Sequence, residues 1–376
     1  MDQTLTNSAP NDAGARALDR LIGAGFSRIE PPALQPASIF LDMSGEEIRG
    51  RLFLTSGPDG DELCLRPDYT IPVCLSYLAS PEAGRQAQYS YLGPVFRARA
   101  GQRSEWRQSG LESYGRADAE AADAEIFALA MEGGEAAGAG ALDVRFGDAG
   151  LFDRVLHALD LPDVLHRRLR RGLAQSRTLD SILDEAANGS AAQTGVLAAL
   201  ERADHEGAKA LVEDLLAIAG IASVGGRSAA EIADRFLEQV SLRAESSAPA
   251  EKREALRRFL AIAGDPDSAS RRLRTLAADA KLDIAQALDS FDQRTGFLAA
   301  RGVAVGGCVF DAAFVRDLDY YTGFVFEAVD PKRADGRPAI GGGRYDRLAR
   351  RLGAGMDIPA VGAAIWIDRL GEEGVG

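Results

Sequence analysis

The sequence predicts an α+β fold: an antiparallel sheet flanked by helices and interrupted by a mostly helical insertion. Residues 12–147 alternate short helical segments with extended segments rich in aromatic residues, which is typical of antiparallel strands. The central block carries Ala, Leu, Arg, Asp and Glu at helical spacing, and residues 303–370 return to strand-like segments. Because the two outer blocks share this character, we expect one sheet domain from residues 1–148 and 303–376, with residues 149–302 inserted into it.

The N-terminal block begins with a predicted helix and continues as a series of strands. Asp12 is a candidate N-cap for the helix "DAGARALDRLIGAGF", which we expect to end at Gly25. The extended segments that follow are "FSRIE", "GRLFLTS", "ELCLRPD", "AQYSYLGPVFRAR" and "EWRQSGLESYG". Between the second and the third of them, "GPDGDE" at residues 57–62 predicts a hairpin turn.

The C-terminal block reads as buried strands with one short helix. The segments "VAVGGCVFDAAFV", "GFVFEAV" and "IPAVGAAIWI" predict the strands, and "RYDRLARRLG" predicts a helix that Gly353 ends. The stretch "VRDLDYYTGFVFEA" places Arg316, Tyr320 and Tyr321 directly before an apolar strand. This gathering of polar and aromatic side chains makes the start of that strand a candidate site.

Charge and composition exclude several classes of function. The net charge of −13 over 376 residues argues against broad contact with nucleic acid, which needs a basic surface. No apolar run approaches the roughly 18 residues that span a bilayer, and the polar N-terminus does not resemble a signal peptide, so we expect a cytoplasmic protein without membrane contact. Neither the cysteines nor the histidines have metal-ligand spacing, so we expect no metal, no cofactor and no histidine general base.

The strand "EWRQSGLESYG" places Trp106, Gln108, Gly110 and Glu112 on one face, because side chains two residues apart point the same way. A glycine between two polar side chains leaves room for something to lie on the sheet. The alternative interpretation is an exposed polar face with a bulge. The pattern alone does not decide between them.

Two further segments could serve a small zwitterionic ligand. "CLRPDYT" supplies Asp68 and Thr70, and "GPVFRAR" supplies Arg97, so an ammonium and a carboxylate could both find partners. Surface ion pairs are the alternative interpretation. The glycine-rich "IGGGRYDRL" (340–348) predicts either a tight turn between strand and helix or close approach of the backbone to a ligand beneath Tyr345.

Taken together and in this order, these segments resemble the catalytic domain of histidyl-tRNA synthetases, which are class II aminoacyl-tRNA synthetases built on an antiparallel sheet. The resemblance covers both outer blocks. It includes the family's motif 2 region, its two histidine-specific signatures, and motif 3 ending at Arg369. The segment "GFSRIEPPALQPASIFLD" (25–42) resembles motif 1, which forms the dimer in that family.

The resemblance implies a pocket for free histidine. Its residues would be Asp68, Thr70, Arg97, Gln108, Glu112, Arg316, Tyr320, Tyr321 and Tyr345. In the family's arrangement, Asp68 and Thr70 hold the α-amino group, and Arg97 and Gln108 steady the carboxylate. Glu112, Tyr321 and Tyr345 hydrogen-bond or flank the imidazole.

The resemblance also assigns roles to Arg316 and to the pair Trp106 and Arg369. Arg316 matches the arginine of a histidine signature, and strict alternation puts it on the opposite face from Tyr321, so the chain must bend between them. Trp106 and Arg369 match residues that stack on adenine and contact a phosphate, and would form a vestigial ATP site.

Departures from the synthetases point to one subfamily. Arg99 stands where the family has an acid, Ser104 where it has an arginine, and Asp68-Tyr69 where it has Glu-Gly. The sequence ends after motif 3, so we expect no C-terminal anticodon-binding domain. This combination resembles the regulatory subunits of ATP phosphoribosyltransferase, which do not aminoacylate.

Membership of that subfamily would imply a non-catalytic subunit that pairs with a short-form ATP phosphoribosyltransferase catalytic subunit. In the subfamily a homodimer sits within a hetero-octamer, and L-histidine is the feedback inhibitor of the first step of histidine biosynthesis. Histidine could occupy the synthetase-like pocket or a subunit interface. The alternatives are a truncated synthetase that activates histidine or another amino acid with ATP, and a scaffold with a dead pocket.

Overall fold

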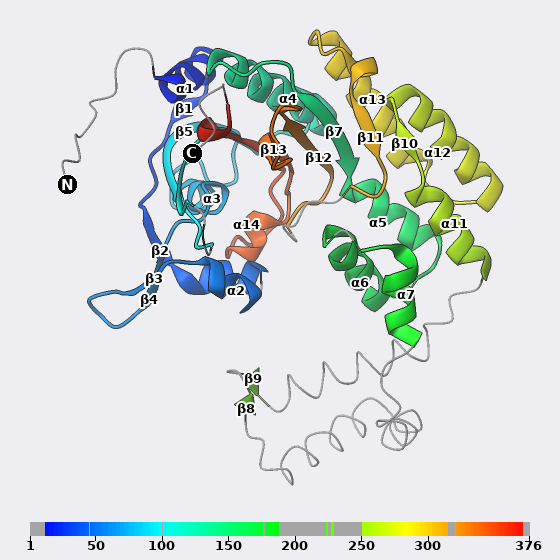
Figure 1. Cartoon of the computed structure of the whole chain (residues 1–376), viewed down its shortest axis with the longest axis horizontal. Coiled ribbons are helices and arrows are strands. Elements are labelled where there is room, and N and C mark those ends of the chain that lie inside the picture. Colours follow the sequence, from blue (N-terminus) through cyan, green and yellow to red (C-terminus); the bar gives the residue numbers. More distant parts are fainter. Residues whose placement is uncertain are drawn as a thin grey trace. The chain divides into compact units, whose positions relative to one another are not determined.

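The computed structural model describes residues 12–44, 46–99, 101, 103–161, 163–175, 177–187, 223–224, 227–228, 250–314 and 320–370. The chain divides into two compact units (Figure 1). The first comprises Met1–Arg154 and Leu260–Gly376, and the second is Val155–Phe259. The second unit falls inside the predicted insertion at residues 149–302, whose boundaries stay a prediction.

A sheet of nine described strands forms the first unit (Figure 1). In spatial order the strands are β1 (Ser27–Arg28), β5 (Ala87–Phe96), β6 (Glu105–Tyr114), β14 (Ala360–Trp366), β13 (Pro338–Arg344), β12 (Phe324–Val329), β7 (Asp143–Asp148), β11 (Val309–Asp311) and β10 (Ala263–Gly264). Neighbouring strands are antiparallel except for β1 with β5 and β11 with β7. The predicted α+β fold with a mostly antiparallel sheet is therefore confirmed.

A small sheet of β2 (Leu34–Pro36), β4 (Glu62–Leu65) and β3 (Leu54–Ser56) accompanies the large one, with α2 (Ala37–Ser44) and the 3-10 helix η1 (Glu46–Arg51). Strands β3 and β4 are joined by the predicted hairpin turn, in which the Gly57 amide donates to the Asp61 carbonyl at 2.8 Å. The turn prediction for residues 57–62 is confirmed.

Helices cover one face of the large sheet. Helix α1 (Ala13–Gly23) packs on β5 and β6, and α4 (Ala119–Ala136) packs on α1 and on β6, β13 and β14. Helix α13 (Ala285–Ala300) packs on α4, and α12 (Pro266–Ala280) on α13. At the start of α1, the Asp12 side chain accepts from the Gly14 amide at 3.0 Å, as the sequence predicts for an N-cap.

The opposite face carries α3 (Thr70–Leu78) and the short α14 (Leu348–Arg351), which contact each other. Helix α14 is followed by Gly353 at φ +103°, the glycine predicted to end it. The predicted helix began at Arg344, but that residue closes strand β13, so the helix is one short turn.

The other α-helices among the described residues are α5 (Ala149–Ala158), which begins in the first unit, and α6 (Asp163–Ala174), α7 (Leu179–Ala187) and α11 (Ala250–Leu260). The short strands β8 (Ser223–Val224) and β9 (Arg227–Ser228) form a two-stranded ladder. None of the helices in the described part of the chain is long and apolar enough to span a bilayer.

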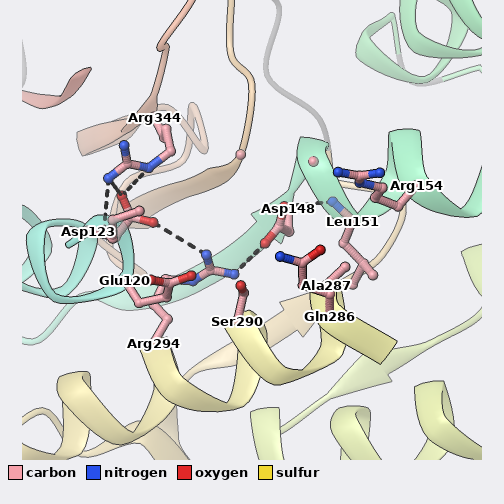
Figure 2. A pocket seen from close by; sticks show the side chains of 13 residues that line it. Glu120, Asp123, Asp148, Leu151, Arg154, Gln286, Ala287, Ser290, Arg294 and Arg344 are labelled. Atoms are coloured by element: carbon pink, nitrogen blue, oxygen red, sulfur yellow. Dashed lines mark hydrogen bonds and ion pairs between the residues drawn. The ribbon is translucent and has the colours of Figure 1, made fainter. Parts of the chain in front are cut away.

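A buried ion cluster fastens the helical face to the sheet (Figure 2). Arg294 of α13 pairs with Asp123 of α4 and with Asp148 at the end of β7, and Arg344 of β13 also pairs with Asp123. Buried ionic groups stabilise a fold only when each has partners, and each of these four does. The cluster therefore fixes how α4, α13 and the sheet meet.

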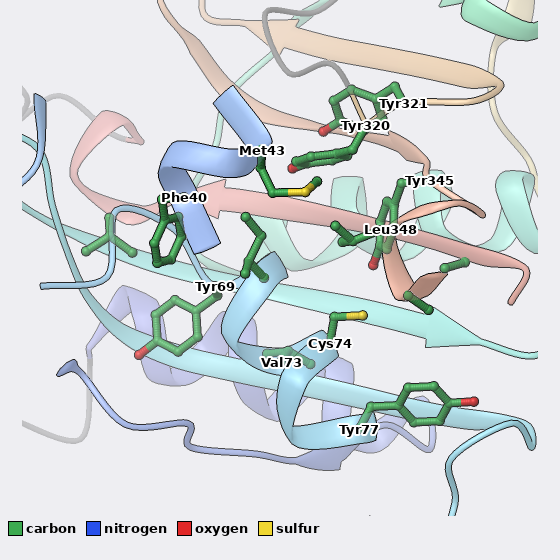
Figure 3. Packing of buried hydrophobic residues seen from close by; sticks show 14 of the residues in the cluster. Phe40, Met43, Tyr69, Val73, Cys74, Tyr77, Tyr320, Tyr321, Tyr345 and Leu348 are labelled. Atoms are coloured by element: carbon green, nitrogen blue, oxygen red, sulfur yellow. The ribbon is translucent and has the colours of Figure 1, made fainter. Parts of the chain in front are cut away.

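Aromatic side chains fill the other face, between the sheet, α3 and α14 (Figure 3). The rings of Tyr69 and Tyr91 stack with centroids 4.2 Å apart, and those of Tyr77 and Tyr114 with centroids 4.4 Å apart. Tyr345 meets Tyr114 edge-on. These rings pack against one another in the cluster, and Tyr345 also lines the candidate site.

Arg66 ties the segment that resembles motif 1 to the rest of the first unit. Its guanidinium donates to the Pro31 carbonyl at 2.6 Å and to the Pro94 carbonyl at 2.9 Å, and lies 4.1 Å from the Tyr69 ring centroid. We expect Arg66→Met to lower the free energy of unfolding by about 2–4 kcal/mol, because it leaves buried acceptors without donors.

Urea denaturation measures this effect. The control is Arg28→Met, which removes an exposed arginine from a 3.6 Å ion pair with Glu30 and should cost less than about 0.5 kcal/mol. Equal losses in the two variants would show that Arg66 contributes no more than a surface arginine.

Candidate functional site

A cavity of about 200 Å³ opens on the sheet face opposite α1 and α4. Its wall includes the predicted residues Asp68, Thr70, Arg97, Gln108, Tyr320, Tyr321 and Tyr345. They come from the start of α3, from the end of β5, from β6 and from the segments flanking β12 and β13. The structure thus brings together residues that are up to 277 positions apart in the sequence (68 to 345).

Glu112 is fully buried and is not part of the cavity wall, but it binds two residues that are. Thr70 Oγ1 donates to Glu112 Oε1 at 2.9 Å, and the Tyr345 hydroxyl donates to Oε2. Burial raises the pKa of Glu112 to about 8, although the two hydroxyl donors act in the opposite direction; the nearby Asp68 raises it further. Burial therefore favours the protonated form of this carboxyl group.

A glycine on the neighbouring strand makes room for that carboxyl group. Gly362 of β14 pairs with Glu112 of β6, and a Cβ at Gly362 would lie 1.5 Å from Glu112 Oε2. No side chain can occupy that space, so position 362 must be glycine for Glu112 to keep its place.

A carboxyl group, from Asp68, and a guanidinium, from Arg97, line the same cavity. Asp68 stands just before α3, where its Oδ1 accepts from the Ile71 amide at 3.3 Å; burial raises its pKa, and the charge of Arg97 partly offsets this. Arg97 donates from Nε to the Pro67 carbonyl at 2.8 Å and lies 4.7 Å from the Trp366 ring centroid. Together they offer one partner for an ammonium group and one for a carboxylate.

Gln108 leaves an acceptor open. Its side chain is 1% exposed, and within the described residues Oε1 has no hydrogen-bond partner. A buried acceptor without a donor costs about 1–3 kcal/mol, so a ligand N–H that reached it would gain binding free energy. Gln108 and Glu112 lie on the same face of β6, as the alternation of the strand predicts, and Gln108 is part of the cavity wall.

The expected role of Gly110 needs correction. We expected the glycine to leave space for a ligand, but the hydroxyl of Tyr91 lies there: a Cβ at Gly110 would be 2.3 Å from Tyr91 Oη. Tyr91 is paired with Gly110 across β5 and β6. The alternative of an exposed face with a bulge is also wrong, because residues 108–114 are buried and the ladder is regular.

Sequence reasoning missed Tyr91. Its ring is buried, and the groups that raise its pKa after burial itself include Glu112, Asp68 and Tyr321, which places its hydroxyl among the site residues. The available signal was the pairing of a large residue with a glycine across two strands, which becomes visible only when their register is known.

The glycine run before Tyr345 is strand, not the tight turn that was one alternative. Residues 341–343 lie inside β13, and a Cβ at Gly342 would be 2.2 Å from the Gly362 carbonyl oxygen. Gly341 and Gly342 line the cavity, so the backbone itself forms part of its wall. This arrangement agrees with the alternative of close backbone approach.

Two of the remaining predicted residues, Trp106 and Arg369, fall outside the cavity wall. Arg316 lies outside the described residues. Trp106 and Arg369 lie together beside Trp366: the Arg369 guanidinium is 5.4 Å from the Trp106 ring centroid and 4.2 Å from that of Trp366. Burial lowers the pKa of Arg369 to about 9, as do the charges of Arg97 and other nearby arginines. No cluster of three or more potential metal ligands occurs among the described residues.

The chain resembles known proteins along most of its length. The family model described as histidyl-tRNA synthetase matches residues 10–222 and 207–370. The ATP phosphoribosyltransferase regulatory subunit of Brucella anthropi is 40% identical over 346 residues, which cover 91% of this chain and 92% of that protein. The subunit of the same name from Brucella canis is 39% identical over the same coverage.

Solved structures share the fold. A Bacillus halodurans protein described as an ATP phosphoribosyltransferase regulatory subunit/histidyl-tRNA synthetase matches with a TM-score of 0.64 and 21% identity, over 95% of this chain and 76% of that one. A histidine–tRNA ligase subunit from Alicyclobacillus acidocaldarius matches with a TM-score of 0.57 and 23% identity, over 98% of this chain and 95% of that one.

Proposed function

This chain belongs to the ATP phosphoribosyltransferase regulatory subunits, a family with a histidyl-tRNA synthetase fold, and we propose that it activates a short-form catalytic subunit and confers histidine feedback on it. The reaction would be the first step of L-histidine biosynthesis. Support for this proposal comes from the name and coverage of the curated relatives, and from a cavity whose groups suit histidine.

The cavity would hold histidine by each of its three polar ends. Asp68 would take the ammonium, Arg97 the carboxylate, and Glu112 an imidazole N–H, with Thr70 and Tyr345 fixing the carboxyl group of Glu112. The open oxygen of Gln108 would accept from a ligand N–H. The buried Glu112 supports the proposal most, because it is held by Thr70 and Tyr345 of the wall of an amino-acid-sized cavity. Arg316, Tyr320 and Tyr321 stay proposed histidine contacts by resemblance.

Reconstitution tests the proposal. The short-form catalytic subunit should show little phosphoribosyl transfer alone, gain at least tenfold when this chain is added, and become inhibitable by histidine only in the mixture. Transfer that runs equally well without this chain would contradict the regulatory role.

Amino-acid activation is the second candidate function, favoured by the buried Arg369 beside Trp106 and Arg97. ATP–pyrophosphate exchange with the purified chain separates the two. The regulatory proposal predicts no histidine-dependent exchange and no aminoacylation; clear exchange would establish catalysis. Residual ATP binding at Trp106 and Arg369 stays a prediction, as does the cytoplasmic location.

The proposed assembly is a homodimer within a hetero-octamer, formed through the motif-1-like segment 25–42. Within that segment, Leu34 is 48% exposed, so its side chain is accessible to a partner subunit. We expect Leu34→Glu to raise the dimer dissociation constant at least tenfold, because it would bury an unpaired charge.

Analytical ultracentrifugation measures the change. Met356→Glu is the matched control, since Met356 is 65% exposed and lies outside the segment. If the Leu34→Glu chain sedimented as tightly dimeric as the control, the segment would not form the interface.

A further inference from the structure

The cavity and the ion cluster of Figure 2 meet at two adjacent residues. Arg344 is the last residue of β13, and Tyr345 follows it. Neighbouring residues of an extended chain point to opposite faces. Accordingly, Tyr345 lines the cavity and binds Glu112, whereas Arg344 reaches the helical face and binds Asp123 of α4.

The guanidinium of Arg344 is held from every side. Nε donates to Asp123 Oδ1 at 2.9 Å, Nη1 to Asp346 Oδ1 at 2.9 Å, and Nη2 to the Ala119 carbonyl at 2.9 Å. A planar fork with three acceptors has one permitted orientation, so Arg344 fixes the backbone to which it is attached.

The backbone around Tyr345 is fixed by the same group of residues. The Tyr345 amide donates to the Ala360 carbonyl at 2.7 Å, and the Ala360 amide donates to Asp346 Oδ1 at 2.8 Å. Thr322 closes the other side, donating its amide to the Arg344 carbonyl at 2.8 Å and accepting from the Asp346 amide at 3.0 Å. Tyr345 therefore sits in a frame that Arg344 and Asp346 build.

The frame continues into the helices. Asp123 accepts from Arg344 through Oδ1 and pairs with Arg294 through Oδ2 at 3.3 Å. Arg294 also binds Asp148, whose Oδ1 accepts from the Leu151 amide at 2.9 Å in the first turn of α5. Hydrogen bonds, ion pairs and the peptide bond between Arg344 and Tyr345 thus connect Glu112, beside the cavity, to α13 and to the start of α5.

We propose that Arg344 is a positioning residue for the ligand cavity: clamped by Asp123 and Asp346, it holds Tyr345 where its hydroxyl can bind Glu112. This inference rests on the proposed function, because histidine affinity is the quantity that shows whether Tyr345 is in place. Through Asp123 and Arg294, a ligand that displaces Tyr345 also disturbs α4, α13 and the start of α5, and a change in those helices alters the cavity.

A double-mutant cycle on histidine affinity tests this role in the full chain, with calorimetry as the measurement. Arg344→Lys keeps the charge and loses the planar fork, and should weaken histidine binding about tenfold. Because the effect passes through the Tyr345 hydroxyl, the same substitution in a Tyr345→Phe background should weaken binding less than threefold. A merely structural loss would instead add to that of Tyr345→Phe.

Two further variants complete the experiment. Arg350→Lys, in an exposed pair with Asp357 at 2.7 Å, is the control and should leave affinity unchanged. Asp346→Asn keeps its shape while removing the carboxylate, and should show the same non-additivity if Arg344→Lys fails to fold. Additive effects, or an unchanged affinity in both variants, would overturn this proposal alone. Absence of histidine binding to the unmodified chain and to its complex would overturn it together with the proposed function.

Discussion

Glu112→Gln is expected to weaken histidine binding at least tenfold at pH 7.5 and to remove the part of the high-pH decline in affinity that comes from Glu112. Glutamine keeps the shape, but its amide oxygen replaces only one of the two acceptors that Thr70 and Tyr345 use, and it cannot share a proton with the imidazole. The burial that raises the pKa of Glu112 to about 8 also disfavours a bare carboxylate beside a neutral ring. We therefore expect the Glu112 carboxyl group and the imidazole of bound histidine to hold one proton between them.

The sign of the pH dependence follows from counting protons. Between the imidazole pKa of about 6.5 and the Glu112 pKa of about 8, free histidine and Glu112 of the unliganded chain together also hold one proton at these two groups. The affinity for histidine should therefore not change with pH in this window. Below this window binding must release a proton and affinity falls as pH falls. Above it, binding must take up a proton, and affinity falls up to tenfold per pH unit as pH rises.

Calorimetric titrations of the wild-type chain and the Glu112→Gln variant from pH 6 to pH 9 measure the fall in affinity on both sides of this pH window. The ligand's own amino group titrates identically with either protein, so the difference between them reports Glu112. Glu105→Gln, at the exposed start of the same strand, is the control and should behave as the wild type. A parallel decline of wild type and Glu112→Gln above pH 8 would show that Glu112 takes no part in the proton balance.

Gly362→Ala is expected to destabilise the chain by at least about 3 kcal/mol and to abolish histidine binding. The added methyl would lie 1.5 Å from Glu112 Oε2 and 2.9 Å from the Leu111 carbonyl oxygen, and neither β6 nor β14 can move without breaking its ladder. Thermal denaturation and calorimetry measure the two effects.

A second substitution assigns the clash to Glu112. In a Glu112→Ala background the carboxyl group is gone, so Gly362→Ala should cost markedly less than in the wild type. Gly355→Ala is the matched control, because a Cβ there meets nothing within 4 Å. Equal costs for Gly362→Ala in both backgrounds would show that the carboxyl group is not what excludes a side chain at position 362.

Local sequence patterns predicted much of the fold and part of the candidate site. Alternation placed Gln108 and Glu112 on one face, and the turn and cap signals at residues 57–62 and Asp12 are confirmed. Each of these rests on residues a few positions apart, where spacing and propensity determine the outcome.

Residues distant in sequence account for what the pattern did not predict. Asp123 pairs with Arg294 and Arg344, which lie 171 and 221 positions away, and no periodicity marks such pairs. Gly110 admits Tyr91 instead of a ligand because the β5–β6 register sets them opposite each other. The glycines at 341–343 look like a turn in sequence, yet β12 and β14 on either side hold them in a strand.

Histidine inhibition of the reconstituted complex tests the central claim most directly. The complex is assembled from the short-form catalytic subunit and either wild-type chain, Glu112→Gln or Glu105→Gln, and phosphoribosyl transfer is measured against histidine concentration. The account predicts that all three chains activate equally and that only Glu112→Gln raises the inhibition constant, by at least tenfold. An unchanged inhibition constant in the Glu112→Gln complex would place the inhibitory histidine outside this cavity and contradict the account.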